Sequence, residues 1–293
     1  MSAITQMNVG RFTVLIDEGE VVTIRRNVAR KLERIVDDYP TASQIVRFDM
    51  APWDGEGVPP IYEIECSPGG LMFNQPDFPW DKLKTIADSV ICLEKEWWEP
   101  YQLLVKKTGW KLVKNWNGRL GRVYFSGNKE DVPDGVEIVT DPWVSKAELI
   151  AVNGGEIIDA RTSLDFGVFN TKYPEGFVLK PVWGWGSRDI YMYPKTWPYS
   201  DFGRPPKEIK NVLRKAIAED NGEWMIQPFF PPQRGELFVK EFTIWRVFAV
   251  RVKNSFELLG GMWSMRPTLK VHGASNTISG EIRVEEDGDE SLD

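Results

Sequence analysis

Apolar and polar positions follow two periods along this chain. A helical period marks residues 26–37, where Val28, Leu32 and Ile35 share one face. A period of two or a short apolar run, both typical of β-strands, recurs in the first two thirds at residues 11–16, 45–50, 61–66, 177–180 and 190–193. The mixture predicts a protein of the α/β (α+β) class.

Further elements follow from the same patterns. Residues 81–98 read as a helix that ends ahead of Pro100, and residues 145–152 as a short helix with Ser145 as its N-cap. Residues 208–219 form an amphipathic pattern. Additional strands are expected at residues 121–125, 136–139, 224–230, 237–252 and 256–265. Strands following one another toward the C-terminus indicate antiparallel pairing there.

Composition narrows the class of protein. A chain of 293 residues, 42% hydrophobic and 27% charged, suits two domains or one large body with lobes. The net charge is −7, and six acids in the last nine residues account for all but one unit of it. We therefore expect an acidic, disordered tail over residues 285–293 and no nucleic-acid-binding surface. We see no membrane span and no secretory signal, and Cys66 and Cys92 form no CxxC pair. These features indicate a cytoplasmic protein. The sequence is also compatible with a homodimer.

Residues 45–66 are the first candidate for chemistry. Alternation places Glu63 and Glu65 on one strand face, and Arg47 and Asp49 on one face of the strand before it. If the two strands pair in register, all four side chains converge. Carboxylates about 7 Å apart repel unless something compensates them, and Mg²⁺ prefers such oxygen ligands. A solvated face, with Arg47 offsetting the acids, is the alternative.

The second candidate is the stretch FVLKPVWGWGSRDIY at residues 177–191. A lysine, Lys180, ends a strand and precedes a loop that contains Gly184, Gly186 and Ser187. Backbone N–H groups in such a loop can cover a phosphate chain, and the lysine adds a point charge. A plain hairpin with an exposed lysine fits this segment equally well, because short glycine motifs are weak evidence.

Arginines on two C-terminal strands form the third candidate. Arg246 and Arg266 each lie on an apolar strand, where a guanidinium could bind phosphate or carboxylate oxygens. Surface arginines on an antiparallel sheet are the alternative. His272 is the single histidine in the chain, and we expect it to serve a structural hydrogen bond rather than catalysis.

Taken together, these stretches resemble the ATP-grasp superfamily. The resemblance rests on a pre-loop lysine in DPWVSKAEL, the lysine of FVLKP with its glycine loop, a hinge at MIQPFF and a strand arginine. A fifth patch, DMAPWDGEGVPPIYEIECSPGG, is similar to an ATP-grasp metal strand but lies upstream of the others. That order is similar to eukaryotic glutathione synthetase and glutathionylspermidine synthetase, which carry an R-x-D segment and an acidic strand upstream of the loop. Glu65 stands where asparagine is usual, and Gly184 where those families place an acid.

The resemblance implies two α+β lobes that clasp ATP, with the metal-binding strand in a permuted position. It implies residues 1–137 as the substrate and metal region, 138–230 as the small lobe and 231–284 as the central sheet. Arg266, Arg47 and Lys180 would be catalytic, with Arg47 on a substrate carboxylate. Mg²⁺ would bind Glu63, Glu65 and Asp49. The nucleotide contacts implied are Lys146, Lys180, Gly184, Gly186, Ser187, Ile226, Gln227, Phe229, Glu241 and Arg246.

The activity implied is that of a ligase. An ATP-grasp ligase phosphorylates a carboxylate, and an amine then attacks the acyl phosphate to give an amide. The partners would be a small carboxylate and an amine, with ATP and Mg²⁺. Two other interpretations stay open: a kinase on the same scaffold, and a nucleotide-binding module without turnover.

Overall fold

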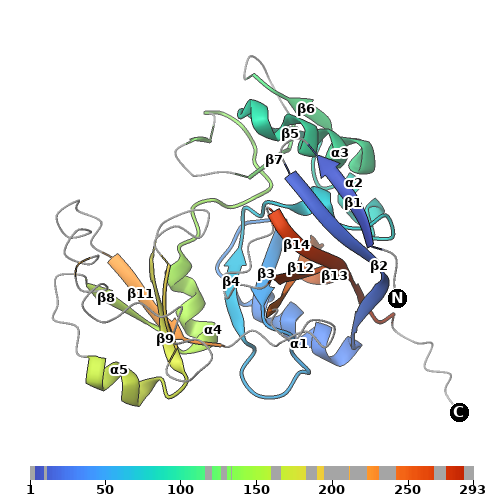
Figure 1. Ribbon diagram of the computed structural model, residues 1–293. Coiled ribbons are helices and arrows are strands. Elements are labelled where there is room, and N and C mark those ends of the chain that lie inside the picture. Colours follow the sequence, from blue (N-terminus) through green and yellow to red (C-terminus); the bar gives the residue numbers. More distant parts are fainter. Residues whose placement is uncertain are drawn as a thin grey trace, which may run out of the picture.

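Three β-sheets organise the protein in a computed structural model (Figure 1). A seven-stranded sheet with helix α1 lies at the centre, a four-stranded sheet with α4 and α5 forms a lobe beside it, and a three-stranded sheet with α2 and α3 lies on the remaining side. The structure describes residues 4–9, 12–115, 121–126, 131–132, 134–159, 166–182, 190–194, 211, 223–230, 242–266 and 275–286.

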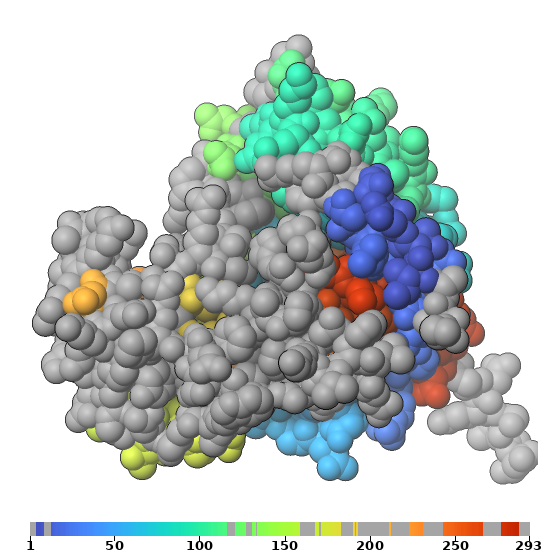
Figure 2. Space-filling model, in the orientation of Figure 1, coloured from blue at the N-terminus to red at the C-terminus, as the bar shows by residue number. Residues whose placement is uncertain are grey.

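The central sheet has the strand order β1-β2-β14-β13-β12-β3-β4. Its neighbours are antiparallel except for β2 and β14, which are parallel. Strands from both ends of the chain therefore lie side by side, and Figure 2 shows blue and red atoms adjacent on one face. The strands are β1 (Ile4–Val9), β2 (Phe12–Ile24), β3 (Ile45–Met50), β4 (Ile61–Glu65), β12 (Phe242–Val252), β13 (Ser255–Arg266) and β14 (Ser275–Val284).

Helix α1 (Arg26–Asp37) covers one face of the central sheet. Its buried residues Val28 and Leu32 pack in one core cluster with Phe48 of β3 and Val247 of β12. The predicted helix is confirmed, and its apolar stripe explains why this face of the sheet is apolar. Burying such side chains is the main force that holds the helix on the sheet.

The three-stranded sheet is parallel, with the order β6-β5-β7. Its layer packs through Leu71 and Phe78 on Ile45 and Phe248, which lie on the central-sheet face opposite α1. The elements are η1 (Leu71–Phe73), α2 (Asp81–Lys84), β5 (Ser89–Ile91), η2 (Lys95–Trp97), α3 (Trp98–Thr108), β6 (Lys111–Val113) and β7 (Val123–Phe125).

The helix predicted over residues 81–98 is wrong. Residues 89–91 form β5 at the centre of the parallel sheet, where burial of Val90 and Ile91 outweighs helix propensity. Pro100 does not end a helix but lies in the first turn of α3, where a missing N–H costs nothing. Of the strand predicted at 136–139, the structure has an isolated bridge between Ile138 and Val123.

The four-stranded sheet is antiparallel, with the order β10-β9-β11-β8. Ser145 caps the predicted short helix as expected, because its hydroxyl accepts the N–H of Ala147 at 3.1 Å. Residues 183–189 and, apart from 211, the predicted helix at 208–219 lie outside the described residues. The elements are η4 (Lys146–Leu149), α4 (Ile150–Asn153), β8 (Glu156–Asp159), α5 (Phe166–Lys172), β9 (Gly176–Pro181), β10 (Tyr191–Pro194) and β11 (Glu223–Pro228).

Segments that are far apart in the sequence belong to the same sheet. Residues 1–137 supply β1 to β4 of the central sheet, and residues 231–284 supply β12 to β14 of the same sheet. Residues 138–230 hold the four-stranded lobe. Of the expected tail, residues 287–293 lie outside the described part. Among the helices described, none combines the length and the apolar character that crossing a bilayer requires.

Candidate functional site

The charged residues of β3 and β4 meet on one face of the central sheet. The strands are antiparallel, with Arg47 opposite Glu65 and Asp49 opposite Glu63, so the predicted register is confirmed. On the other side of β3, Arg246 of β12 lies opposite Asp49. Directly opposite residues share a face, so these five side chains form one charged patch, which we call the charged cluster.

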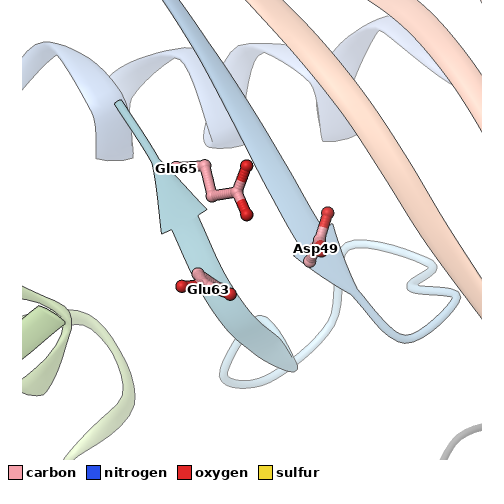
Figure 3. Close-up of side chains that lie close together, drawn as sticks. All are labelled: Asp49, Glu63 and Glu65. Atoms are coloured by element: carbon pink, nitrogen blue, oxygen red, sulfur yellow. The ribbon is translucent and has the colours of Figure 1, made fainter. Parts of the chain in front are cut away.

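Three carboxylates of the charged cluster lie close together (Figure 3). Asp49, Glu63 and Glu65 each offer a carboxylate oxygen within 4.8 Å of the others. Figure 3 shows Asp49 on β3 and the two glutamates on β4, with the Glu65 carboxylate turned toward β3. Oxygen donors at this spacing are suited to a hard divalent cation.

Arg47 is the buried centre of the cluster, with 7% of its surface exposed. Its Nε and Nη2 lie 2.6 and 2.9 Å from the two oxygens of Asp49, and Nη2 lies 2.9 Å from Oε1 of Glu65. Its Nη1 donates to the backbone carbonyl of Gly69 at 2.6 Å. The sequence suggested a contact to a substrate carboxylate, but every nitrogen of this guanidinium already binds a group of the protein.

Arg246 is less completely paired than Arg47. Its Nε lies 3.7 Å from Oδ1 of Asp49, and this buried nitrogen has no hydrogen-bond partner among the described residues. Burial lowers the pKa of Arg246, with Asp49 opposing the shift and Arg47 adding to it. Arg246 is therefore a cation whose charge the protein compensates only in part, as an anion-binding residue requires.

Two lysines from the four-stranded lobe reach the same cluster. Lys146 Nζ lies 3.0 Å from Oε1 of Glu63, and Lys180 Nζ donates to the Tyr62 carbonyl at 2.8 Å. The Lys146 backbone N–H donates to the Val182 carbonyl at 3.3 Å, which brings the pre-loop segment beside the end of β9. The two lysines, 34 positions apart in the chain, thus flank the acids on β4.

Burial and charge act differently on the lysine and the two glutamates. Burial lowers the pKa of Lys180 to about 8, although Glu63 opposes the shift. Burial alone would raise the pKa of Glu63, but Lys146 and Lys180 outweigh it and the pKa is lowered. Burial raises the pKa of Glu65 to about 7; Arg47 opposes this rise, while Glu63 and Asp49 add to it. Of the two glutamates, Glu65 is therefore the one whose ionised form the protein stabilises less.

The predicted hinge residues lie on β11 and just beyond it. Strand register places Gln227 on the same sheet face as Lys180, whereas Ile226 lies on the opposite face and is buried. The amide oxygen of Gln227 accepts from Asn153 Nδ2 at 3.2 Å. Phe229 packs on Val178 in an apolar cluster that also contacts Ile190 and Met192. This apolar cluster adjoins Lys180 along the strand.

Several predicted residues stay untested. Gly184, Gly186, Ser187, Glu241 and His272 lie outside the described residues. Arg266 ends β13 opposite Phe242, and the register places its position on the sheet face that carries Arg246. The two glycines predicted to contact phosphate, Gly184 and Gly186, therefore stay a prediction. The predicted residues that the structure brings together are Arg47, Asp49, Glu63, Glu65, Arg246, Lys146 and Lys180.

Sequence reasoning missed the backbone groups and one side chain that complete the site. The carbonyls of Gly69 and Tyr62 accept from Arg47 and Lys180, and Asn153 joins the hinge to β4 through the Ile61 carbonyl at 3.4 Å. The SPGG turn after Glu65 was the one available signal, since glycine permits a turn that exposes a carbonyl. The acceptor at Tyr62 is a backbone carbonyl, which every residue has, so residue type at position 62 could not have predicted this contact.

Comparison with known proteins adds no family. No protein-family model matches the chain, and a search of curated proteins finds no significant match. Functional conclusions therefore rest on the charged cluster and on the two lysines beside it.

Proposed function

We propose that this protein is an ATP-dependent carboxylate–amine ligase built on an ATP-grasp fold. The observation that carries the proposal is the convergence of Lys146 and Lys180, from the four-stranded lobe, with Asp49, Glu63 and Glu65 of the central sheet. These residues come from parts of the chain that are far apart in sequence. Folding has therefore gathered cations and oxygen ligands at one place between two sheets.

The two lysines supply the charge that a polyphosphate requires. Lys180 is 3% exposed and Lys146 is partly exposed, so an anion that contacts both is partly withdrawn from water. Attraction between opposite charges is stronger there than in bulk solvent. We assign the α- and β-phosphates of ATP to these lysines.

The carboxylates fit a divalent cation. Their oxygens lie within 4.8 Å of one another, and carboxylate oxygen is the ligand type that Mg²⁺ prefers. Burial raises the pKa of Glu65 to about 7, with Glu63 and Asp49 adding to the rise, so a bound cation would stabilise its ionised form. Asp49, Glu63 and Glu65 would hold Mg²⁺, which when bound neutralises charge on the β- and γ-phosphates.

The apolar cluster around Phe229 and Val178 fits the adenine ring. It lies on the sheet face that carries Lys180, so a base at Phe229 would leave the phosphates near the two lysines. Gln227 lies between Phe229 and Met225 on this face, but its side-chain oxygen is bound to Asn153. We therefore assign Phe229 to the ring, with Gln227 and Ile226 as the hinge residues that precede it.

The proposed reaction joins two small molecules. A substrate carboxylate oxygen attacks the γ-phosphorus, ADP leaves, and the amine then attacks the acyl carbon and releases phosphate with formation of an amide. Phosphoryl transfer depends on positioning and charge neutralisation, which basic residues can provide. We assign Arg246, whose buried Nε has no hydrogen-bond partner among the described residues, to stabilise charge on the transferred group, and assign Arg266 to the same task.

The role of Arg47 changes in this proposal. Because its nitrogens bind Asp49, Glu65 and the Gly69 carbonyl, it orients the metal ligands and does not contact the substrate. A residue that hydrogen-bonds metal-binding carboxylates holds them in place and raises metal affinity. The substrate carboxylate then requires another cation, and we assign this role to Arg246 and Arg266, whose positions lie on the same sheet face.

A panel of carboxylates and amines tests the proposed reaction directly. We expect ADP to form only when a matching acid and amine are both present with Mg-ATP, and expect Glu63→Gln to abolish it. Mass spectrometry should show a product lighter by one water than the two substrates combined. A product heavier by a phosphate would indicate a kinase instead. ATP binding without ADP formation across the panel would indicate a nucleotide-binding module.

A further inference from the structure

The charged cluster and its two lysines carry more positive than negative groups. Three carboxylates face four basic side chains, so the net charge is +1 when all are ionised. The members are Asp49, Glu63 and Glu65 against Arg47, Arg246, Lys146 and Lys180. Such a site repels a free divalent cation and attracts a polyphosphate, because charge interactions are strong where water is partly excluded. The acids are thus already neutralised by the protein itself.

The basic groups differ in how firmly they are held. Arg47 is buried and bound at three groups, and Lys180 is buried with its Nζ on a backbone carbonyl. By contrast, the Lys146–Glu63 pair is partly exposed, with 19% and 23% of the two side chains accessible. Lysine is a point charge on a flexible stem and can change partners without moving the backbone. The contact that can exchange is therefore the one between Lys146 and Glu63.

We propose that Lys146 is an internal counter-cation that occupies Glu63 in the ligand-free protein and moves to the polyphosphate when nucleotide binds. Its departure frees the Glu63 carboxylate for the divalent cation. A bound nucleotide draws Lys146 away from Glu63 and so favours metal binding. A bound metal displaces Lys146 from Glu63 and so favours nucleotide binding, which means that each ligand raises the affinity for the other. This inference rests on the proposed nucleotide and metal site, but it concerns what Lys146 does before either ligand arrives.

Opposite effects on two ligands test this role. We would titrate the protein with Mn²⁺ alone, following free Mn²⁺ by electron paramagnetic resonance, and with ATP in EDTA by calorimetry. Lys146→Met should bind Mn²⁺ about tenfold tighter, and metal-free ATP about tenfold weaker, because one positive charge is lost near both ligands. A lysine that only supports the fold would weaken both or neither.

Two further variants control the experiment. Lys172→Met removes a lysine from a comparable ion pair of the same lobe, 2.9 Å from Glu156 Oε2 and away from the charged cluster, and should change neither affinity. Lys146→Arg retains the charge and should keep the weak Mn²⁺ binding of the wild type. Circular dichroism would show that each variant is folded.

The outcomes separate this inference from the proposed function. An Mn²⁺ affinity of Lys146→Met that is equal to or weaker than that of the wild type overturns the counter-cation role. So does an absence of Mn²⁺ binding to either protein. If neither protein binds ATP but Lys146→Met gains Mn²⁺ affinity, Lys146 does shield Glu63 and the proposed ATP-dependent function is wrong.

Discussion

The two faces of β3, β4 and β12 differ in chemistry where the charged cluster lies. The charged face also carries the buried apolar residues Ile45 and Phe248, and its two glutamates are partly exposed. One face carries Phe48 and Val247, which pack on α1, while the other carries Arg47, Asp49 and Arg246. Phe48 is 0% exposed and Arg47, its neighbour in the chain, is 7% exposed. Strands with alternating apolar and polar residues usually bury the apolar face and expose the polar face to water. Here Arg47 and Asp49 on the polar face are buried as well. Replacing a buried ion pair by well-packed apolar residues is often neutral or stabilising, so the fold itself does not require these charges.

Removing one member from each face should reveal how each is stabilised. Phe48→Ala leaves a cavity in the α1 core and should lower the free energy of unfolding by about 3–5 kcal/mol. Arg47→Met should lower the free energy of unfolding by a comparable ~3 kcal/mol for another reason. The buried Asp49 and the partly buried Glu65 then lose their main counter-charge. Urea unfolding at neutral pH measures both. Full stability of Arg47→Met would mean that the charged face is hydrated and the comparison of two buried faces is mistaken.

A double substitution sharpens the difference between the faces. Arg47→Met with Asp49→Asn removes both the cation and its closest anion, so the second change should restore about 1–2 kcal/mol of the loss. Phe48→Ala combined with Val247→Ala enlarges a cavity and should restore nothing. The same unfolding experiment decides. Additive losses in the charged pair would contradict direct compensation between Arg47 and Asp49.

A smaller effect concerns Lys107, a partly buried cation that has no carboxylate partner in the described part of the chain. Lys107 Nζ donates to the carbonyls of Asn74 and Met72 at 2.6 and 3.2 Å and lies 4.5 Å from the centre of the Trp80 ring. Burial lowers the pKa of Lys107 to about 8, whereas in the unfolded chain it is near the usual ~10.4.

Between these two values the unfolded chain binds more protons, so the free energy of unfolding should rise with pH in that window. The rise should be about 1 kcal/mol, less than the full pKa difference implies, because water screens the partly exposed ammonium group. Lys107→Met should remove this rise. Unfolding curves of the variant and the wild type at pH 7.5 and 10 provide the measurement, and identical pH dependence in both proteins would refute the assignment.

The sequence predicted the charged cluster better than its surroundings. Period-two alternation identified β3 and β4, and pairing them in register was enough to bring Arg47 opposite Glu65. Local patterns could not show that Arg246, about two hundred residues away, lies opposite Asp49, because strand order is a tertiary property. They also misread residues 81–98, where burial of β5 in a parallel sheet overrode helix-forming composition.

Backbone contacts were the other part that sequence could not supply. The sequence predicts Lys180 as a phosphate ligand from its place before the glycine-containing segment, which stays a prediction. Its contact with the Tyr62 carbonyl depends on how two sheets pack. Similarly, alternation shows that Ile226 and Gln227 face opposite sides of β11, but only the packed structure shows Gln227 bound to Asn153. Residue type therefore predicts which side chains could bind a ligand. Which of them are already bound to other groups of the protein is decided by the packing of the sheets.

The central claim is that the cations of one lobe and the carboxylates of the central sheet together bind Mg-ATP. Isothermal calorimetry with Mg-ATP tests it most directly, using the wild type, Lys180→Met and Glu63→Gln, with Lys172→Met as the control. We predict one binding site in the wild type and in the control, with affinity at least roughly tenfold weaker in the other two variants. Binding that is absent from the wild type, or unchanged in both Lys180→Met and Glu63→Gln, would contradict the claim.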